Sequence, residues 1–152
     1  MNNDLIKILN ILTDLAQLDI DAVYAYEQAI EQINEVEVRE NIMSFRDDHN
    51  RHIDELGDMI VKKGGLVPER KRDFKGFVIE GFTALRSMTG TYGALRAMEI
   101  NEKTTNRNYK SALDENPDLP EDVIALLEKN YSDERRHLAY IQNTVLKLKQ
   151  KV

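Results

Sequence analysis

Residues 127–145, LEKNYSDERRHLAYIQNTV, contain the pattern that decides both the fold and the candidate chemistry of this chain. Apolar residues recur there every three or four positions, as they do on the buried face of an α-helix. Glu134 lies in the middle of that apolar face, and His137, three residues later, lies at its edge. The stretch therefore predicts a long amphipathic helix with a carboxylate and an imidazole on its buried side.

The same helical periodicity extends over most of the sequence and predicts an all-α protein. Four long helices are expected, at about residues 3–33, 35–63, 91–114 and 119–149. A shorter crossover helix, 74–88, is expected in the long connection between the second and the third. The simplest architecture that buries all four apolar faces is an antiparallel four-helix bundle.

Local signals predict where these helices begin and end. Asn34, followed three residues later by Glu37, resembles a capping box at the start of the second helix. The glycine pair at 64–65 is expected to end that helix. Thr91 and Asp118 are expected to cap the third and fourth long helices.

Length, composition and charge exclude several functional classes. The 152 residues fit one domain, 1–152, and the absence of cysteine excludes disulfides, thiol catalysis and cysteine-ligated metals. The net charge of -6 argues against a protein that binds nucleic acid through phosphate contacts. No apolar run approaches the length of a membrane span and no targeting segment is evident, so a cytoplasmic location is expected.

Six acidic or imidazole side chains fall on or beside the apolar faces of the four helices, where a bundle would bury them. They are Asp19, His49, His52, Glu102, Glu134 and His137. Asp19 lies 15 residues before Asn34 and His49 lies 15 residues after it, so antiparallel helices would bring the two to the same height. A similar count along the third and fourth long helices brings Glu102 and Glu134 to roughly the same height. We therefore expect three carboxylates and three imidazoles in one layer of the bundle.

Such a layer requires compensation, because an unpaired charge in a protein core costs several kcal/mol. No lysine or arginine falls on these faces at this height, whereas a divalent metal would balance the carboxylates. Carboxylate and imidazole ligands suit iron, manganese or zinc. Three alternatives stay open. In the first, Glu27 replaces Asp19 as a ligand, because the register of the first helix differs by two turns. In the second, Asp19 is not a ligand but orients His49 or His52. In the third, the whole layer is hydrogen-bonded without metal.

Four short stretches carry a resemblance to known proteins: LDIDA (18–22), AYEQAI (25–30), FRDDH (45–49) and DERRHL (133–138). In these stretches the chain resembles a bacterial branch of the ferritin-like proteins, the dinuclear-metal carboxylate class, and the resemblance covers nearly its whole length. That class uses one Glu from each of two helices and a Glu-x-x-His pair from each of the other two. Glu134 with His137 matches one such pair, and Glu102 matches one of the single acids.

Two positions depart from that class. Asp19 stands where the class has a glutamate, and His49 stands where the second Glu-x-x-His pair would begin, before His52. The resemblance implies a ferritin-like fold and two iron ions per chain, with manganese or zinc as alternatives. It also implies ferroxidase or peroxidase-like reactions with dioxygen or peroxide, in iron handling or oxidative stress. The alternatives are a metal-free, stress-associated structural or interaction bundle, or a structural zinc protein.

Further residues around the layer have simpler expected roles. Tyr26 and Tyr109 face inward and are expected to donate hydroxyl hydrogen bonds to a carboxylate. Asp48 and Asp133 are expected at the surface, paired with Arg46, Arg51 or Arg136.

A few apolar side chains lie off the predicted core faces, namely Ile6, Ile20, Tyr24 and Ile100. Exposed apolar stripes mark interfaces, so we expect them to meet the crossover helix or a second copy of the chain. A homodimer is the oligomeric state that this pattern favours.

Overall fold

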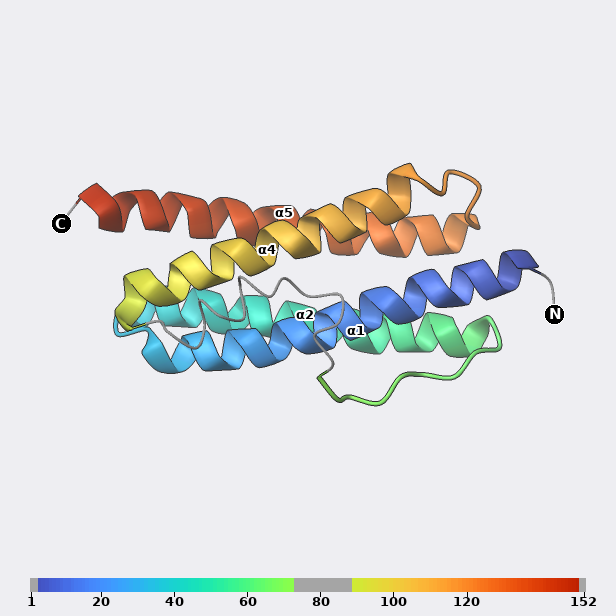
Figure 1. The fold of residues 1–152 in the computed structure, drawn as a ribbon, viewed down its shortest axis with the longest axis horizontal. Coiled ribbons are helices and arrows are strands. Elements are labelled where there is room, and N and C mark those ends of the chain that lie inside the picture. Colours follow the sequence, from blue (N-terminus) through green and yellow to red (C-terminus); the bar gives the residue numbers. More distant parts are fainter. Residues whose placement is uncertain (1–2, 73–88, 151–152) are drawn as a thin grey trace.

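A computed structural model describes residues 3–72 and 89–150, which form four long helices in one bundle (Figure 1). The helices are α1 (Asn3–Gln32), α2 (Val36–Lys62), α4 (Gly90–Asp114) and α5 (Glu121–Gln150). The predicted all-α four-helix bundle is confirmed, and the helix limits agree with the predicted ones to within two residues. The predicted crossover helix, 74–88, lies outside the described residues.

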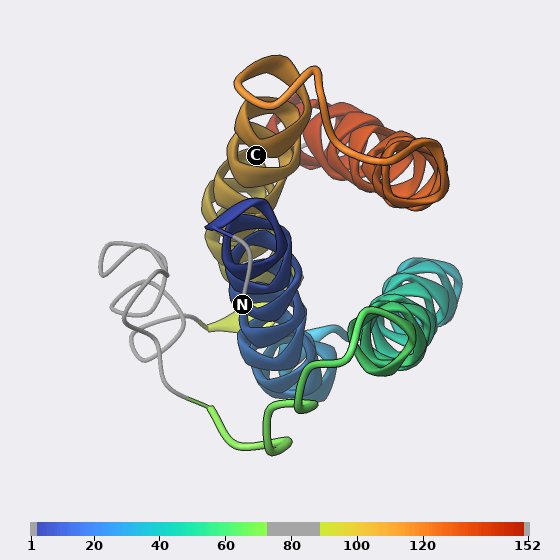
Figure 2. The ribbon, with the colours of Figure 1, turned by 90° about the vertical axis from the view of Figure 1, so that its right-hand side faces the viewer.

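The four helices form two antiparallel hairpins, α1 with α2 and α4 with α5 (Figure 1). Because α2 ends at one end of the bundle and α4 begins at the other, these two helices run in the same direction. In the end-on view α1 lies beside both α2 and α4, and α5 lies beside α4 (Figure 2). The fourth side of the bundle, between α2 and α5, is the least extensive helix contact.

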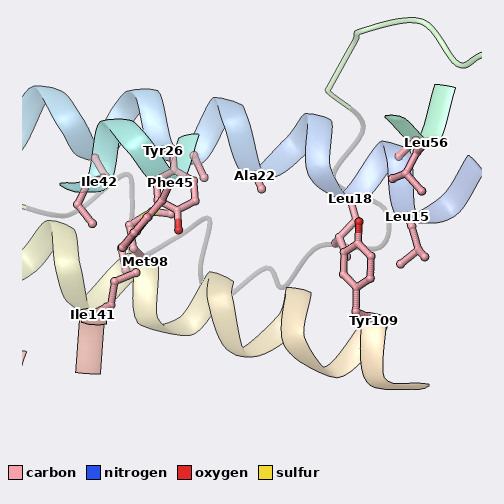
Figure 3. Close-up of a cluster of buried hydrophobic side chains, with 14 of the residues drawn as sticks. Leu15, Leu18, Ala22, Tyr26, Ile42, Phe45, Leu56, Met98, Tyr109 and Ile141 are labelled. Atoms are coloured by element: carbon pink, nitrogen blue, oxygen red, sulfur yellow. The ribbon is translucent and has the colours of Figure 1, made fainter. Parts of the chain in front are cut away.

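Apolar side chains fill the bundle on both sides of one polar layer. Figure 3 shows two groups of them, one containing Tyr26, Phe45 and Met98 and the other containing Leu18 and Tyr109. All five side chains are buried, and each large apolar side chain contributes about 1.5–3 kcal/mol through burial. The two tyrosine hydroxyls reach from α1 and α4 into the layer between the groups.

Some helix ends differ from the predicted caps. Glu35, not Asn34, occupies the cap position of α2, and it makes no side-chain cap bond. Asn34 instead donates its backbone N–H to the hydroxyl of Thr91, 2.9 Å away, so this threonine joins the α1–α2 turn to the start of α4. Thr89, not Thr91, is the cap residue of α4.

The glycine pair at 64–65 ends α2 as predicted. Gly64 has a φ of 88°, in the left-handed region that glycine adopts without steric penalty. The N–H of Gly65 then bonds the carbonyl of Ile60 at 2.9 Å, which closes the last turn. At the start of α5 the carboxylate of Asp122, not that of Asp118, accepts a backbone hydrogen bond, from the N–H of Val123 at 2.9 Å.

Within the described part of the chain, no helix combines the length and apolar character that a membrane span requires. Of the residues expected off the core faces, Ile6 is exposed, Tyr24 and Ile100 are half-buried and Ile20 is buried. Ile20 is buried but does not belong to the hydrophobic core cluster of the bundle, in keeping with its expected place off the core face.

Candidate metal centre

The polar layer brings together the six side chains that the sequence singled out, and each is at most 1% exposed. They come from all four helices: Asp19 on α1, His49 and His52 on α2, Glu102 on α4, and Glu134 and His137 on α5. The helical periodicity explains this convergence, because each of the six shares a face with core residues of its own helix.

The six residues form two overlapping groups of potential ligands. The Asp19 group contains Asp19, His49, His52 and Glu134, and the Glu102 group contains His49, Glu102, Glu134 and His137. In each group, one ligand atom from every residue lies within 4.8 Å of the others. His49 and Glu134 are shared, so the two groups are adjacent.

His49 stands between the two groups and contacts both with its ring nitrogens. Its Nδ1 lies 2.6 Å from Oδ1 of Asp19. Its Nε2 lies 3.1 Å from Oε1 of Glu102 and 3.4 Å from Oε2 of Glu134. The ring is completely buried, and the hydrogen-bond and ion-pair partners of its nitrogens among the described residues are all carboxylates.

The other two histidines point their Nδ1 atoms into the layer. His52 Nδ1 lies 3.1 Å from Oδ1 of Asp19 and 3.3 Å from Oε1 of Glu134. His137 Nδ1 lies 3.5 Å from Oε1 of Glu102 and 3.6 Å from Oε2 of Glu134. Glu134 therefore presents Oε1 toward the Asp19 group and Oε2 toward the Glu102 group.

The outer nitrogens of these two rings are held by carboxylates from the facing helix. His52 Nε2 lies 2.9 Å from Oδ2 of Asp133 on α5, and His137 Nε2 lies 2.8 Å from Oδ2 of Asp48 on α2. Such a contact fixes the orientation of a ligating imidazole and raises its basicity. The two acids are only partly exposed, at 17% and 21% of their side chains.

These contacts correct the expectation that Asp48 and Asp133 serve only at the surface. Their pairing with arginines is confirmed, since Arg136 bonds Asp48 and Arg51 bonds Asp133, both at 2.7 Å. Arg46 pairs with the neighbouring Asp47 instead. A signal for the histidine contacts was present in the sequence, because the pattern Asp-x-x-Arg-His occurs twice, at 48–52 and at 133–137.

The inward-facing tyrosines bond the site carboxylates, as predicted. Tyr109 on α4 donates its hydroxyl to Oδ2 of Asp19 on α1, at 2.7 Å. Tyr26 on α1 donates its hydroxyl to Oε1 of Glu102 on α4. Sequence reasoning missed Thr105, whose hydroxyl lies 3.1 Å from an oxygen of both Glu102 and Glu134 and can donate to one of them at a time.

The histidines set the charge state of the carboxylates. Burial alone would raise the pKa of Asp19, but the charges of His52 and His49 and their hydrogen bonds lower it to about 2. Burial would also raise the pKa of Glu102, yet the adjacent imidazoles of His137 and His49 hold it well below its usual value. Glu134 differs, because burial and the charge of Glu102 raise its pKa despite the opposing charge of His49.

The carboxylates in turn keep the histidines protonated when no metal is bound. Burial would lower the pKa of His52, but Asp19 and the hydrogen bond to Asp133 raise it to about 11. The hydrogen bond to Asp48 and the nearby carboxylate of Glu102 overcome burial to raise the pKa of His137 to about 10. Positive imidazoles and negative carboxylates therefore balance in this layer, which makes its burial tolerable without a metal.

Two atoms of the layer nevertheless lack a hydrogen-bond partner among the described residues, Glu134 Oε1 and His137 Nδ1. A buried polar atom without a partner costs about 1–3 kcal/mol. Both atoms can donate an electron pair to a divalent cation, and both point into the layer. The residues present therefore fit a metal. Glu27, the alternative ligand on α1, is exposed and belongs to neither group.

The sequence pattern of a family described as a domain of unknown function, DUF2383, matches residues 7–115. The chain belongs to the DUF2383 family. The match covers Asp19, His49, His52 and Glu102 and ends before α5, so Glu134 and His137 lie beyond it. A comparison with curated proteins finds no match for the chain.

The DUF2383 chain is similar to a crystal structure of ferritin-like, diiron-carboxylate proteins from Bacillus anthracis str. Ames. The two are 15% identical, the similarity covers 95% of this chain and 99% of that one, and the TM-score is 0.77. At this identity the likeness shows the fold, which is ferritin-like as the resemblance in the sequence implied.

The two facing helices of the DUF2383 chain carry different residues at one equivalent position. In the repeated Asp-x-x-Arg-His pattern, the residue after the aspartate is His49 on α2 and Glu134 on α5. These are the two residues that the ligand groups share. An imidazole therefore stands on α2 where the pattern on α5 has a carboxylate.

Proposed function

We propose that this protein is a ferritin-like, non-haem metal protein that holds two divalent ions per chain in the polar layer. Iron is the metal we favour, with manganese or zinc as alternatives, and the activity we favour is of the ferroxidase or peroxidase type. The observation that carries the proposal is the pair of overlapping, fully buried ligand groups that meet at His49 and Glu134.

The proposed ligands are Asp19, His49, His52, Glu102, Glu134 and His137. Two Fe(II) ions bound there would supply two electrons, which with two protons reduce peroxide to water or dioxygen to hydrogen peroxide. The chain's own residues hold this site in shape. Tyr109 and Tyr26 fix the carboxylates of Asp19 and Glu102 by hydrogen bonds. Phe45 stacks on the ring of His137 with 4.3 Å between ring centroids, which shields that side from water.

A metal-free structural bundle is the second candidate, and one observation favours it. The three histidines and the buried carboxylates form ion pairs, such as His49 Nδ1 with Asp19 Oδ1, that neutralise the layer without an ion. A protein with one structural zinc is an intermediate case, because zinc would occupy one ligand group and undergo no redox change.

The test is to load the purified protein anaerobically with Fe(II), remove free metal and measure iron per chain. We expect two irons per chain, with loss of iron in His137→Ala and no loss in Glu27→Gln, an exposed acid on α1 that serves as the matched control. Consumption of dioxygen or peroxide by the loaded protein would then support turnover. One zinc that iron does not displace would favour the structural zinc, and no metal under either condition would favour the metal-free bundle.

We further propose a cytoplasmic homodimer of this single domain, acting in iron handling or in defence against oxidants. The exposed apolar residue Ile6 and the half-buried Tyr24 and Ile100 support an interface between copies. Light scattering coupled to size-exclusion chromatography measures the molar mass directly, and a value near 17.6 kDa would contradict the dimer.

A further inference from the structure

Of the two residues shared by the ligand groups, only one can serve both groups at once. A carboxylate has two oxygens, and those of Glu134 already face different ways, Oε1 toward His52 and Oε2 toward His137. A neutral imidazole has one lone pair, and its other ring nitrogen carries a proton. His49 can therefore give a ligand atom to one group and only an N–H to the other.

The contacts of His49 indicate which group receives the lone pair. The distance from Nδ1 to Asp19 Oδ1 is 2.6 Å, the length of a strong, charge-assisted hydrogen bond. The distances from Nε2 to Glu102 Oε1 and Glu134 Oε2 are longer, 3.1 and 3.4 Å. When an ion displaces one of the two protons of the metal-free ring, the proton at Nδ1, between His49 and Asp19, is therefore the one retained, and Nε2 gives its lone pair to the Glu102 group.

The carboxylates of both groups accept hydrogen bonds, so the difference between the groups lies in their imidazoles. Oδ2 of Asp19 accepts the hydroxyl of Tyr109 at 2.7 Å, and Glu102 accepts the hydroxyl of Tyr26. In the Glu102 group, His137 Nδ1 has no hydrogen-bond partner among the described residues and can ligate an ion. The Glu102 group thus offers four donors, whereas the Asp19 group offers three once His49 is excluded.

We propose that His49 makes the two positions unequal, so that the Glu102 group binds the first divalent ion and the Asp19 group binds the second, more weakly. This inference rests on the proposed function and ranks its two positions. The protein then passes through a form with one ion at the Glu102 group, held by Glu102, Glu134, His137 and Nε2 of His49. If both shared residues were carboxylates, the two metal positions would be more nearly alike. With His49 as one of the shared residues, the two metal positions are not equivalent.

The test is a titration of the whole chain with Co(II), whose visible absorption reports the number and type of its ligands. Wild-type protein should bind in two steps whose dissociation constants differ by about tenfold or more. Asp19→Asn should remove the weaker step and keep the tighter one, weakened by at most about 10–100-fold because Asp19 also orients His49. Glu102→Gln should weaken the tighter step, and His49→Glu, which supplies a second two-oxygen carboxylate, should bring the two constants together.

The outcomes separate the inference from the proposed function. Two steps of equal affinity, or loss of the tighter step in Asp19→Asn, would overturn the ranking and leave the dinuclear site standing. A single step that Glu102→Gln removes and Asp19→Asn keeps would uphold the ranking and overturn the dinuclear site. Absence of any step in the wild type would overturn both. Circular dichroism of each variant verifies the helical fold, and the two amide variants, Asp19→Asn and Glu102→Gln, decide the ranking if His49→Glu does not fold.

Discussion

Asp48 on α2 accepts a hydrogen bond from Nε2 of His137 on α5, 2.8 Å away, across the least extensive contact of the bundle. Asp133 and His52 make the same contact in the opposite direction, at 2.9 Å. Each aspartate lies one residue before a shared member of the ligand groups, and each orients a histidine that the opposite helix carries. The two helices therefore position each other's imidazoles.

Asp48→Asn should weaken metal binding at the Glu102 group by about 10–100-fold, because Asn is a poorer acceptor for the N–H of His137. The helical fold should be retained. Titration with Co(II) measures the effect, and Asp47→Asn is the matched control because Asp47 is exposed and pairs only with Arg46 among the described residues. Equal affinities in Asp48→Asn and Asp47→Asn would show that this carboxylate does not orient the ligand.

Metal removal should lower the thermal stability of the protein. An ion that binds only the folded state at 100 times its dissociation constant contributes about 2.7 kcal/mol, which corresponds to a shift of about 5–10 °C for a chain of this length. Melting curves with Co(II) and with a chelator measure the shift. Glu134→Ala should remove most of it, since Glu134 belongs to both ligand groups. An unchanged melting temperature in the presence of chelator would count against a metal in this layer.

The metal-free protein should be most stable between about pH 4 and 6.5. The folded-state pKa of Asp19 is lowered to about 2, so its contribution is present above its ordinary value of 3.8 and is lost as the pH falls through 2. The pKa values of His137 and His52 are raised from 6.5 to about 10 and 11, so their contribution is full below 6.5 and declines as the pH rises toward those values.

The measurement is the melting temperature of chelator-treated protein as a function of pH. We expect a fall of about 5 °C or more between pH 6.5 and 9, because the buried carboxylates lose their positive partners. Metal-loaded protein should show the opposite trend over pH 5–8, since a metal must displace protons from the histidines and binds better as the pH rises. Parallel curves for the two forms would be inconsistent with histidine ligands.

Tyr26→Phe should destabilise the metal-free protein by about 1–3 kcal/mol, because Glu102 would lose a hydrogen bond inside the core. Tyr92→Phe on the exposed part of α4 is the matched control and should have little effect. Urea unfolding in chelator gives both free energies. Equal stability of the two variants would mean that the Tyr26 hydroxyl contributes nothing to the layer.

The sequence was sufficient for the layer because two simple rules apply to long straight helices. A turn of 100° per residue places Asp19 and His49 on core faces, and a rise of 1.5 Å per residue makes them level. In the structure, Nδ1 of His49 lies 2.6 Å from Oδ1 of Asp19. Tyr109 followed from the same rules, since it faces inward on α4 and bonds Asp19.

The same rules could not predict the contacts of Asp48 and Asp133. Both lie beside the core face of their helices, and only the distance between α2 and α5 decides whether their carboxylates reach water or a facing histidine. That distance depends on the packing of whole helices. The predicted cap of α2 was wrong for a different reason. The backbone N–H of Asn34 donates a hydrogen bond to a tertiary partner, Thr91, that is 57 residues away in the sequence.

The division of the bundle into two hairpins has a consequence for how the molecule comes apart. The α1–α2 hairpin carries three members of the Asp19 group and takes the fourth, Glu134, from the other hairpin. The α4–α5 hairpin carries three members of the Glu102 group and takes the fourth, His49, in the same way. Each bound ion would thus link the two halves of the chain. Separating the hairpins would break both coordination shells at once, so metal should slow unfolding more than it speeds folding.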